Sequence, residues 1–190
     1  MAEPVDLDIR PVSASEYDAL GALTAQAYLQ GGLLDFGEQD PYLPKLRDVA
    51  RRAATAEVLV AVGDPLPGDD DEAGERAPGP RLLGGITFVP GPGPMADMAR
   101  DGEAEIRTLA VAPEARGRGV GEALTRACLD RARAAGFRNV VLCSQTRMHA
   151  AHRLYRRLGF TRVPDRDWSP AEKLDTQLLA YTLDLTGGQN

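Results

Sequence analysis

The spacing of hydrophobic positions divides the chain into predicted strands and helices. Residues 5–12 alternate apolar and polar side chains with a period of two, which is typical of a half-buried strand. Short apolar runs predict further strands at 57–63, 81–90, 105–111, 139–143, 160–163 and 178–185. Apolar residues recur at helical spacing in four segments, which begin after Ser13, at Tyr42 (to Ala54), at Val120 (to about Gly136) and near Ala151 (to Leu158).

The predicted elements follow the order β, α, α, β, β, β, α, β, α, β, β, which indicates a mixed α/β (α+β) protein. The length of 190 residues favours a single domain over residues 1–190. Residues 64–80 are charged, rich in proline and glycine, and almost free of large apolar side chains. We expect them to form a mobile insertion between two strands, because they bury too little surface to offset their ordering entropy. An acidic recruiting loop is the alternative.

Charge and cysteine content narrow the functional classes. The chain has 22 Lys and Arg against 28 Asp and Glu, a net charge of −6, and no basic block that predicts a nucleic-acid surface. It has no apolar run of membrane-spanning length and does not start with a cleavable leader, so we expect a cytoplasmic protein without membrane contact. Cys128 and Cys143 are expected to be reduced core residues, and no spacing suggests a metal site.

The segment from Glu105 to Gly136 carries the clearest chemical signal. A buried strand ends before Pro113, a glycine-rich loop runs from Arg116 to Gly121, and an amphipathic helix follows. The first N–H groups of a helix have no internal partner and carry the positive end of its dipole, so they bind phosphate oxygens. Glycine allows close approach to the backbone, and Arg118 adds positive charge with Arg116. The segment therefore predicts a pyrophosphate site, against the simpler alternative of a plain strand–turn–helix.

The letters of the loop distinguish between the known phosphate-binding patterns. Glu122 follows Gly121 where a Walker A loop needs lysine, and it also takes the last small position of a dinucleotide fingerprint. Arg-x-x-Gly-x-Gly fits from Arg116 to Gly121, and L-A-V-A-P-E precedes it. This combination resembles the acyl-CoA-binding motif of the GNAT family of N-acetyltransferases.

The resemblance implies a GNAT fold, with a twisted, mixed, mostly antiparallel sheet flanked by helices and splayed central strands. It implies acetyl-CoA as the cosubstrate. The backbone around Leu109 and Val111 is expected to pair with the pantetheine arm, and Val111 to contact the thioester carbonyl. The family often has an asparagine seven residues before its tyrosine, where this chain has Met148. The implied cofactor-binding residues are Leu109, Ala110, Val111, Arg116, Gly117, Arg118, Gly119, Val120, Gly121 and Met148.

Two catalytic roles also follow from the resemblance. L-Y-R-R-L-G-F resembles the family segment whose tyrosine protonates the CoA sulfur, here Tyr155; a core tyrosine is the alternative. Glu105 stands where several members keep a glutamate base, in a cleft that would raise its pKa. A solvated glutamate beside Glu103 is the alternative. His149 and His152 flank this region and are left outside the catalytic set.

The leading hypothesis is an acetyl-CoA-dependent N-acetyltransferase that acts on a primary amine of a small molecule, peptide or protein, as a monomer or homodimer. A non-catalytic acyl-CoA-binding sensor of the same fold is the second hypothesis, and a nucleotide-binding oxidoreductase is the third. In the resemblance, the glycine- and leucine-rich segment 28–42 lies over the acceptor side of the cleft; an ordinary connection between helices is the alternative.

Overall fold

The structure is a computed structural model, and it describes residues 6–64, 79–170 and 176–187. Its centre is a seven-stranded sheet with the order β1-β2-β3-β4-β5-β7-β6. All neighbouring strands are antiparallel except β4 and β5, which are parallel. The strands are β1 (Leu7–Pro11), β2 (Glu57–Gly63), β3 (Arg81–Val89), β4 (Glu103–Val111), β5 (Asn139–Gln145), β6 (Thr161–Arg162) and β7 (Leu178–Asp184). This confirms the predicted mixed α/β sheet.

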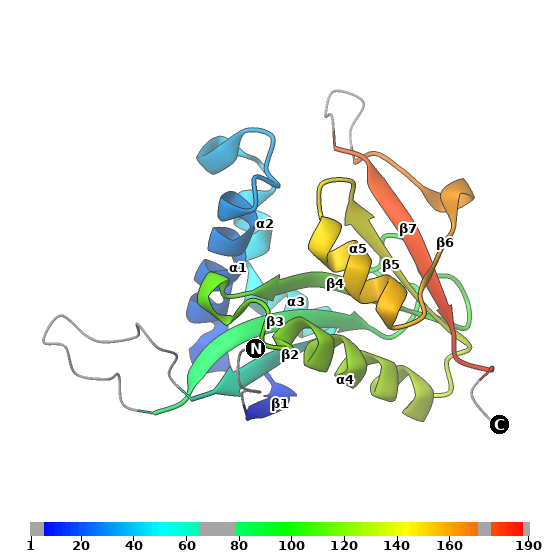
Figure 1. The fold of residues 1–190 in the computed structure, drawn as a ribbon, viewed down its shortest axis with the longest axis horizontal. Coiled ribbons are helices and arrows are strands. Elements are labelled where there is room, and N and C mark those ends of the chain that lie inside the picture. Colours follow the sequence, from blue (N-terminus) through cyan, green and yellow to red (C-terminus); the bar gives the residue numbers. More distant parts are fainter. Residues whose placement is uncertain (1–5, 65–78, 171–175, 188–190) are drawn as a thin grey trace, which may run out of the picture.

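Helices cover both faces of this sheet (Figure 1). They are α1 (Tyr17–Gln30), α2 (Leu43–Arg47), α3 (Val49–Thr55), α4 (Val120–Ala134) and α5 (His149–Arg157). Two neighbouring glycines of β3 mark the two faces. A Cβ on Gly84 would collide with β4 and approach Leu124 of α4, whereas a Cβ on Gly85 would collide with Leu20 of α1. The absence of side chains therefore lets α1 and α4 approach the sheet closely from opposite sides.

Alternate side chains of β2 point to opposite faces of the sheet and belong to two different parts of the core. Val58, Val60 and Val62 pack with Leu20 of α1 and Val49 of α3. The residues between them, including Leu59, belong to the larger core formed with α4 and α5. Both faces of β2 are buried, as its nearly continuous apolar sequence requires.

The parallel ladder between β4 and β5 is short. It pairs the strands from Glu103 with Asn139 to Ile106 with Leu142. Beyond Ile106, β4 stays paired with β3, while β5 stays paired with β7 as far as Gln145. The two central strands therefore separate toward their carboxyl ends, as Figure 1 shows for β4 and β5.

The predicted helix over Tyr42–Ala54 is wrong in one respect, because it is two helices. Asp48 separates α2 from α3 with a ψ angle of 73°, outside the helical region. Its side chain accepts a hydrogen bond of 3.0 Å from the N–H of Arg51 and so caps α3. An aspartate in this position competes with the helical backbone, and the periodicity of apolar residues did not reveal it.

Two other boundaries bear on the predictions. β4 begins at Glu103, two residues before the predicted start. Most of the predicted insertion at 64–80 lies outside the described residues, which omit 65–78. The strands that flank it, β2 and β3, pair as antiparallel neighbours from Gly63 and Arg81 onward.

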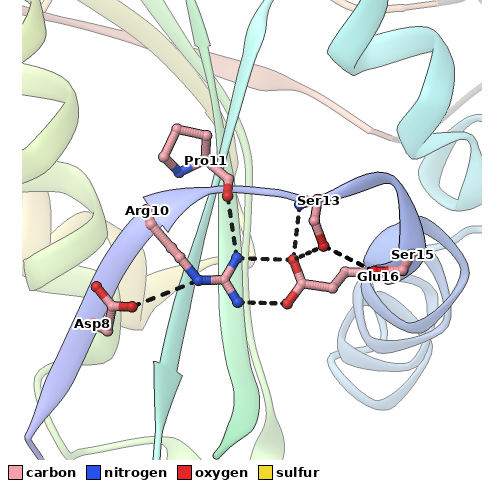
Figure 2. A network of polar contacts seen from close by, with 6 residues as sticks. All are labelled: Asp8, Arg10, Pro11, Ser13, Ser15 and Glu16. Carbon is pink, nitrogen blue, oxygen red and sulfur yellow. Dashed lines mark hydrogen bonds and ion pairs between the residues drawn. The ribbon is translucent and has the colours of Figure 1, made fainter.

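A polar cluster connects β1 to α1 (Figure 2). The Arg10 guanidinium donates two hydrogen bonds to the Glu16 carboxylate, of 2.9 and 2.7 Å. The N–H and hydroxyl of Ser13 both donate to the same carboxylate at 2.8 Å. These hydrogen bonds lower the pKa of Glu16 to about 2, and those from Arg10 have the largest effect. The cluster fixes the direction in which α1 leaves the sheet.

Candidate active site

A pocket of about 510 Å³ opens where β4 and β5 separate. Residues 106–109 of β4 and 143–145 of β5 form its two sides, and Tyr155 of α5 borders it. The remainder is lined by residues from α1, α2, α3 and the connection between α1 and α2, by Pro94, Met95 and Asp97 before β4, and by Trp168, Pro170, Thr176 and Leu178. The predicted placement of segment 28–42 against this cleft agrees with the lining by Tyr28, Leu33, Leu34 and Tyr42.

A β-bulge shapes the β4 side of the pocket. Thr108 has a φ angle of 53°, in the left-handed region, where no other non-glycine residue of the described chain lies. The pairing with β3 shifts register at the same point, between Thr87–Arg107 and Gly85–Ala110. A β-branched residue in this conformation is strained, and the surrounding sheet must hold it there. The bulge bends β4 beside the pocket, where Thr108 and Leu109 form its wall.

Beyond the bulge, β4 has an unpaired edge on the side of the cleft. The N–H of Ala112 donates to the carbonyl of Leu83 at 2.9 Å, on the β3 side. Peptide groups alternate in direction along a strand, so the N–H groups of Val111 and Leu109 point to the opposite edge. Ala110 is buried and pairs with Gly85 of β3. A pantetheine arm, which resembles a short peptide, fits such an edge.

The glycine loop is open on its outer side. Gly117 and Gly119 have φ angles of 77° and 84°, and a Cβ on either would meet no atom within 4 Å. Gly119 is the N-cap of α4, and its carbonyl accepts the first helical hydrogen bond, from Ala123 at 2.9 Å. The N–H groups of the first turn, which begins at Val120, therefore face open space. This geometry fits the predicted pyrophosphate site.

Two arginines and one glycine complete the loop. Arg116 is exposed and Arg118 is partly exposed, and neither forms an ion pair with any residue that the structure describes. A Cβ on Gly121 would lie 3.6 Å from both Leu154 and Val111. The end of the loop therefore packs between β4 and α5, next to the unpaired edge of β4.

Tyr155 places a phenol at the pocket from α5. The residue is only 4% exposed, and its ring packs against Phe160 and Tyr181 at centroid distances of 5.7 and 5.9 Å. Burial raises its pKa above the ordinary value, so the hydroxyl keeps its proton at neutral pH. Within the described chain the hydroxyl has no hydrogen-bond partner, although it lies at the pocket. Both the packing role and the availability of the proton are thus present in one side chain.

Glu105 has surroundings that differ from those expected. Its side chain is fully buried, and its carboxylate accepts hydrogen bonds of 2.9–3.3 Å from the N–H groups of Asp97, Met98 and Ala99. Burial raises its pKa, while the N–H bonds and Arg107 lower it. Among the described residues, those that line the pocket do not include Glu105. Glu105 therefore anchors the connection before β4 and does not line the pocket, whereas the prediction of a base placed it in a cleft that would raise its pKa.

That connection brings another carboxylate to the pocket, which the sequence did not reveal. Asp97 lines the pocket and forms an ion pair with Arg107. Burial raises the pKa of Asp97, and the charge of Arg107 lowers it. The sequence around Asp97 shows only an irregular segment, and the position of its side chain depends on the bonds to Glu105.

The β5 side of the pocket differs from simple core packing. Met148 lies directly before α5, lines the pocket, and its sulfur accepts a hydrogen bond of 3.5 Å from the Ser144 hydroxyl. Cys143 also lines the pocket, so the prediction of a purely core cysteine is wrong in this respect. Its thiol is free, and burial raises its pKa to about 12. His152, which lies outside the predicted catalytic set, is buried against Tyr181 at a ring distance of 5.6 Å.

Sequence comparison assigns the family. Residues 68–160 match the acetyltransferase (GNAT) family, and this segment contains β4, the glycine loop, α4, β5 and α5. The chain carries a GNAT acetyltransferase domain. No curated protein matches the chain.

Solved structures of this family share the fold. A GCN5-related N-acetyltransferase from Kribbella flavida is 25% identical, with a TM-score of 0.60 over 94% of this chain and 98% of that one. A ribosomal-protein-alanine N-acetyltransferase from Brucella melitensis is 19% identical, with a TM-score of 0.62 over 94% and 99%. A putative acetyltransferase from Salmonella typhimurium, solved with acetyl-CoA, is 19% identical, with a TM-score of 0.61 over 94% of each chain. These similarities establish the GNAT fold. In the described part of the chain, no helix combines the length and apolarity needed to cross a membrane.

Proposed function

We propose that this GNAT protein is an acetyl-CoA-dependent N-acetyltransferase that acts on a primary amine. The observation that carries the proposal is the position of Tyr155. Its unpartnered hydroxyl borders the pocket at the point where β4 and β5 separate. A module that only binds acyl-CoA would need the loop and the strand edge, but it would not need a proton donor there.

Acetyl-CoA supplies the acetyl group as a thioester, and the chain offers two binding surfaces for it. The N–H groups at the start of α4, with Arg116 and Arg118, hold the pyrophosphate. The unpaired edge of β4 binds the pantetheine arm through its peptide groups. Met148 packs against the arm, without the polar contact that an asparagine would make.

The thioester carbonyl is polarised by a backbone N–H of β4. Leu109 is the better choice for this contact, because it lines the pocket next to the bulge. Val111 lies two residues closer to the glycine loop and is assigned to the pantetheine arm instead. A fixed N–H at this position stabilises negative charge that develops on the carbonyl oxygen, without reorganisation.

Tyr155 protonates the departing sulfur. A thiolate that stayed unprotonated would recapture the acetyl group, so a proton donor drives the reaction forward. The raised pKa of the phenol keeps it protonated until the sulfur leaves.

The attacking amine must be neutral, and we assign the proton acceptor to Asp97 in place of Glu105. Asp97 borders the pocket, and burial raises the pKa of its carboxylate, which makes it a stronger base than an exposed aspartate. Glu105 is already bonded to three backbone N–H groups and is separated from solvent.

The test combines binding and turnover. Acetyl-CoA binding is measured by calorimetry, and release of the CoA thiol is measured against a panel of amino acids, polyamines and peptides with free N-termini. The proposal expects acetyl-CoA to bind and at least one amine to accelerate thiol release, with an N-acetylated product in the mass spectrum. Binding of acetyl-CoA without amine-dependent release across the panel would instead support an acyl-CoA sensor.

A further inference from the structure

The end of the pocket formed by α2 and α3 contains a buried arginine that forms no ion pair with any described residue. We propose that the acceptor is a small amine that also carries a carboxylate, as a free amino acid does, and that Arg52 binds this carboxylate. The inference rests on the proposed N-acetyltransferase function and narrows its substrate class.

Arg52 is only 6% exposed, yet it lines the pocket. Its Nη1 donates hydrogen bonds of 2.9 Å to the carbonyls of Lys45 and Leu46. Its Nε is buried without a partner, and its Nη2 forms no hydrogen bond in the described chain. No carboxylate of a described residue lies within ion-pair distance of the guanidinium. A buried charge with unused donors is costly unless a ligand satisfies it.

The nearby carboxylates of the pocket are already engaged elsewhere. Asp35 binds Arg147 at 2.7 Å and the hydroxyl of Thr176 at 2.6 Å. Asp40 accepts two backbone N–H groups of its own turn. Asp48 caps the start of α3 at 3.0 Å. Arg52 therefore forms no ion pair with the pocket wall, although the charge of Asp48 acts on it from beyond ion-pair distance.

The simplest structural role for Arg52 does not account for all of its donors. Its bonds to the last turn of α2 stabilise the break between α2 and α3, and Nη1 alone makes both of them. Nε is buried away from the pocket surface, so Nη2 is the donor that remains open to a ligand, and it can donate a charge-assisted hydrogen bond to a carboxylate. Lys45 and Arg51 also line this end of the pocket, and neither has an ion pair within the described residues. This end of the pocket thus has the cations of Lys45, Arg51 and Arg52 against the carboxylates of Asp40 and Asp48.

The pocket connects Arg52 to the catalytic end. Tyr28 is partly buried on the pocket wall, and burial raises its pKa; Tyr155 raises it further, whereas the charge of Arg52 lowers it. Tyr28 is therefore within electrostatic reach of both residues. An acceptor with its carboxylate on Arg52 extends its amine past Tyr28 toward the thioester site.

The experiment compares amino acids with their carboxamides, which have the same side chain and lack the negative charge. Thiol release from saturating acetyl-CoA is measured for L-methionine and L-methioninamide, L-phenylalanine and L-phenylalaninamide, and L-glutamine and L-glutaminamide. We expect kcat/KM for the best acid to exceed that of its amide by about tenfold or more, the size of one charge-assisted contact. Arg52→Gln should reduce this ratio to about one, and Arg52→Lys should retain part of it. Arg133→Gln, on the exposed side of α4, changes the net charge equally and should leave the ratio unchanged.

Several results would overturn the inference. The inference is overturned if the amides react as well as their acids in the parent protein. This comparison needs no variant, so misfolding of Arg52→Gln does not block the test. A folded Arg52→Gln protein that slows both members of a pair equally would assign Arg52 to the α2–α3 break alone. If acetyl-CoA binds but no amine releases thiol, the proposed function fails, and calorimetry with the same pairs decides the inference: preference for the acids supports it, and equal or absent binding contradicts it.

Discussion

Ile106 and Leu142 form the last pair of the parallel ladder between β4 and β5. Beyond this pair, β4 stays paired with β3 and β5 stays paired with β7, but β4 and β5 no longer pair with each other. Backbone groups of β4 therefore become available to a ligand. The same separation admits Tyr155 from α5 to the pocket. One interruption of the sheet thus produces both the edge that we assign to the cofactor and the position of the proton donor that we propose.

The glycine loop predicts a strong effect on acetyl-CoA binding. Gly119→Glu places a side chain and a negative charge where the pyrophosphate is expected, and should weaken binding by at least ~2 kcal/mol. Gly119→Asn is the control, because asparagine tolerates the left-handed conformation without adding charge. Calorimetry on both folded variants measures the difference. Unchanged affinity in Gly119→Glu would remove the pyrophosphate from this loop.

Two substitutions of Glu105 distinguish a catalytic base from a structural anchor. Glu105→Gln cannot take a proton, but its amide oxygen can still accept backbone N–H bonds, so we expect kcat within a few-fold of the parent. Glu105→Leu leaves the N–H groups of Asp97, Met98 and Ala99 without their acceptor, and should lower the free energy of unfolding by about 3 kcal/mol or more. Chemical denaturation and initial rates measure the two effects. A loss of turnover of ~100-fold in a stable Glu105→Gln protein would restore Glu105 as the base.

The role of Asp97 as the base predicts that turnover depends on pH. A base must be deprotonated, and burial raises the pKa of Asp97, so activity should fall with decreasing pH earlier than for an ordinary aspartate. Asp97→Asn should lower kcat by roughly 10²-fold near neutral pH with little change in KM for acetyl-CoA. The lost activity should return in part as the pH rises and the free amine becomes abundant. Equal pH profiles for parent and variant would show that Asp97 takes no proton.

The Arg10–Glu16 cluster predicts a pH dependence of stability (Figure 2). The pKa of Glu16 falls from 4.5 to about 2 on folding, so the folded state favours the ionised form. Its contribution is therefore complete above pH ~4.5 and disappears as the pH falls toward 2. Glu16→Gln should reduce the free energy of unfolding at pH 7 by about 1 kcal/mol, since the pair is partly exposed. The difference between the two proteins should shrink across this window, and a constant difference down to pH 2 would contradict the assignment.

The sequence predicted local features better than distant contacts. The strand at Glu57–Gly63 and the glycine loop were predicted because apolar spacing and glycine positions determine them locally. The break at Asp48 depends on one side-chain cap, which periodicity does not detect. The roles of Glu105, Asp97 and Arg52 depend on segments that fold against them, so the residue types alone did not separate a base from an anchor.

Tyr155→Phe tests whether the hydroxyl of Tyr155 protonates the CoA sulfur. The variant keeps the ring and its contacts with Phe160, so the fold and acetyl-CoA binding should be preserved. Tyr181→Phe is the matched control, because it removes a phenol from the neighbouring ring without touching the pocket lining. With saturating acetyl-CoA and an acceptor amine, the account predicts a kcat lowered by roughly 10²-fold or more in Tyr155→Phe, a nearly constant KM for acetyl-CoA, and no loss in Tyr181→Phe. A Tyr155→Phe protein that acetylates as fast as the parent would show that Tyr155 is a packing residue and contradict the mechanism.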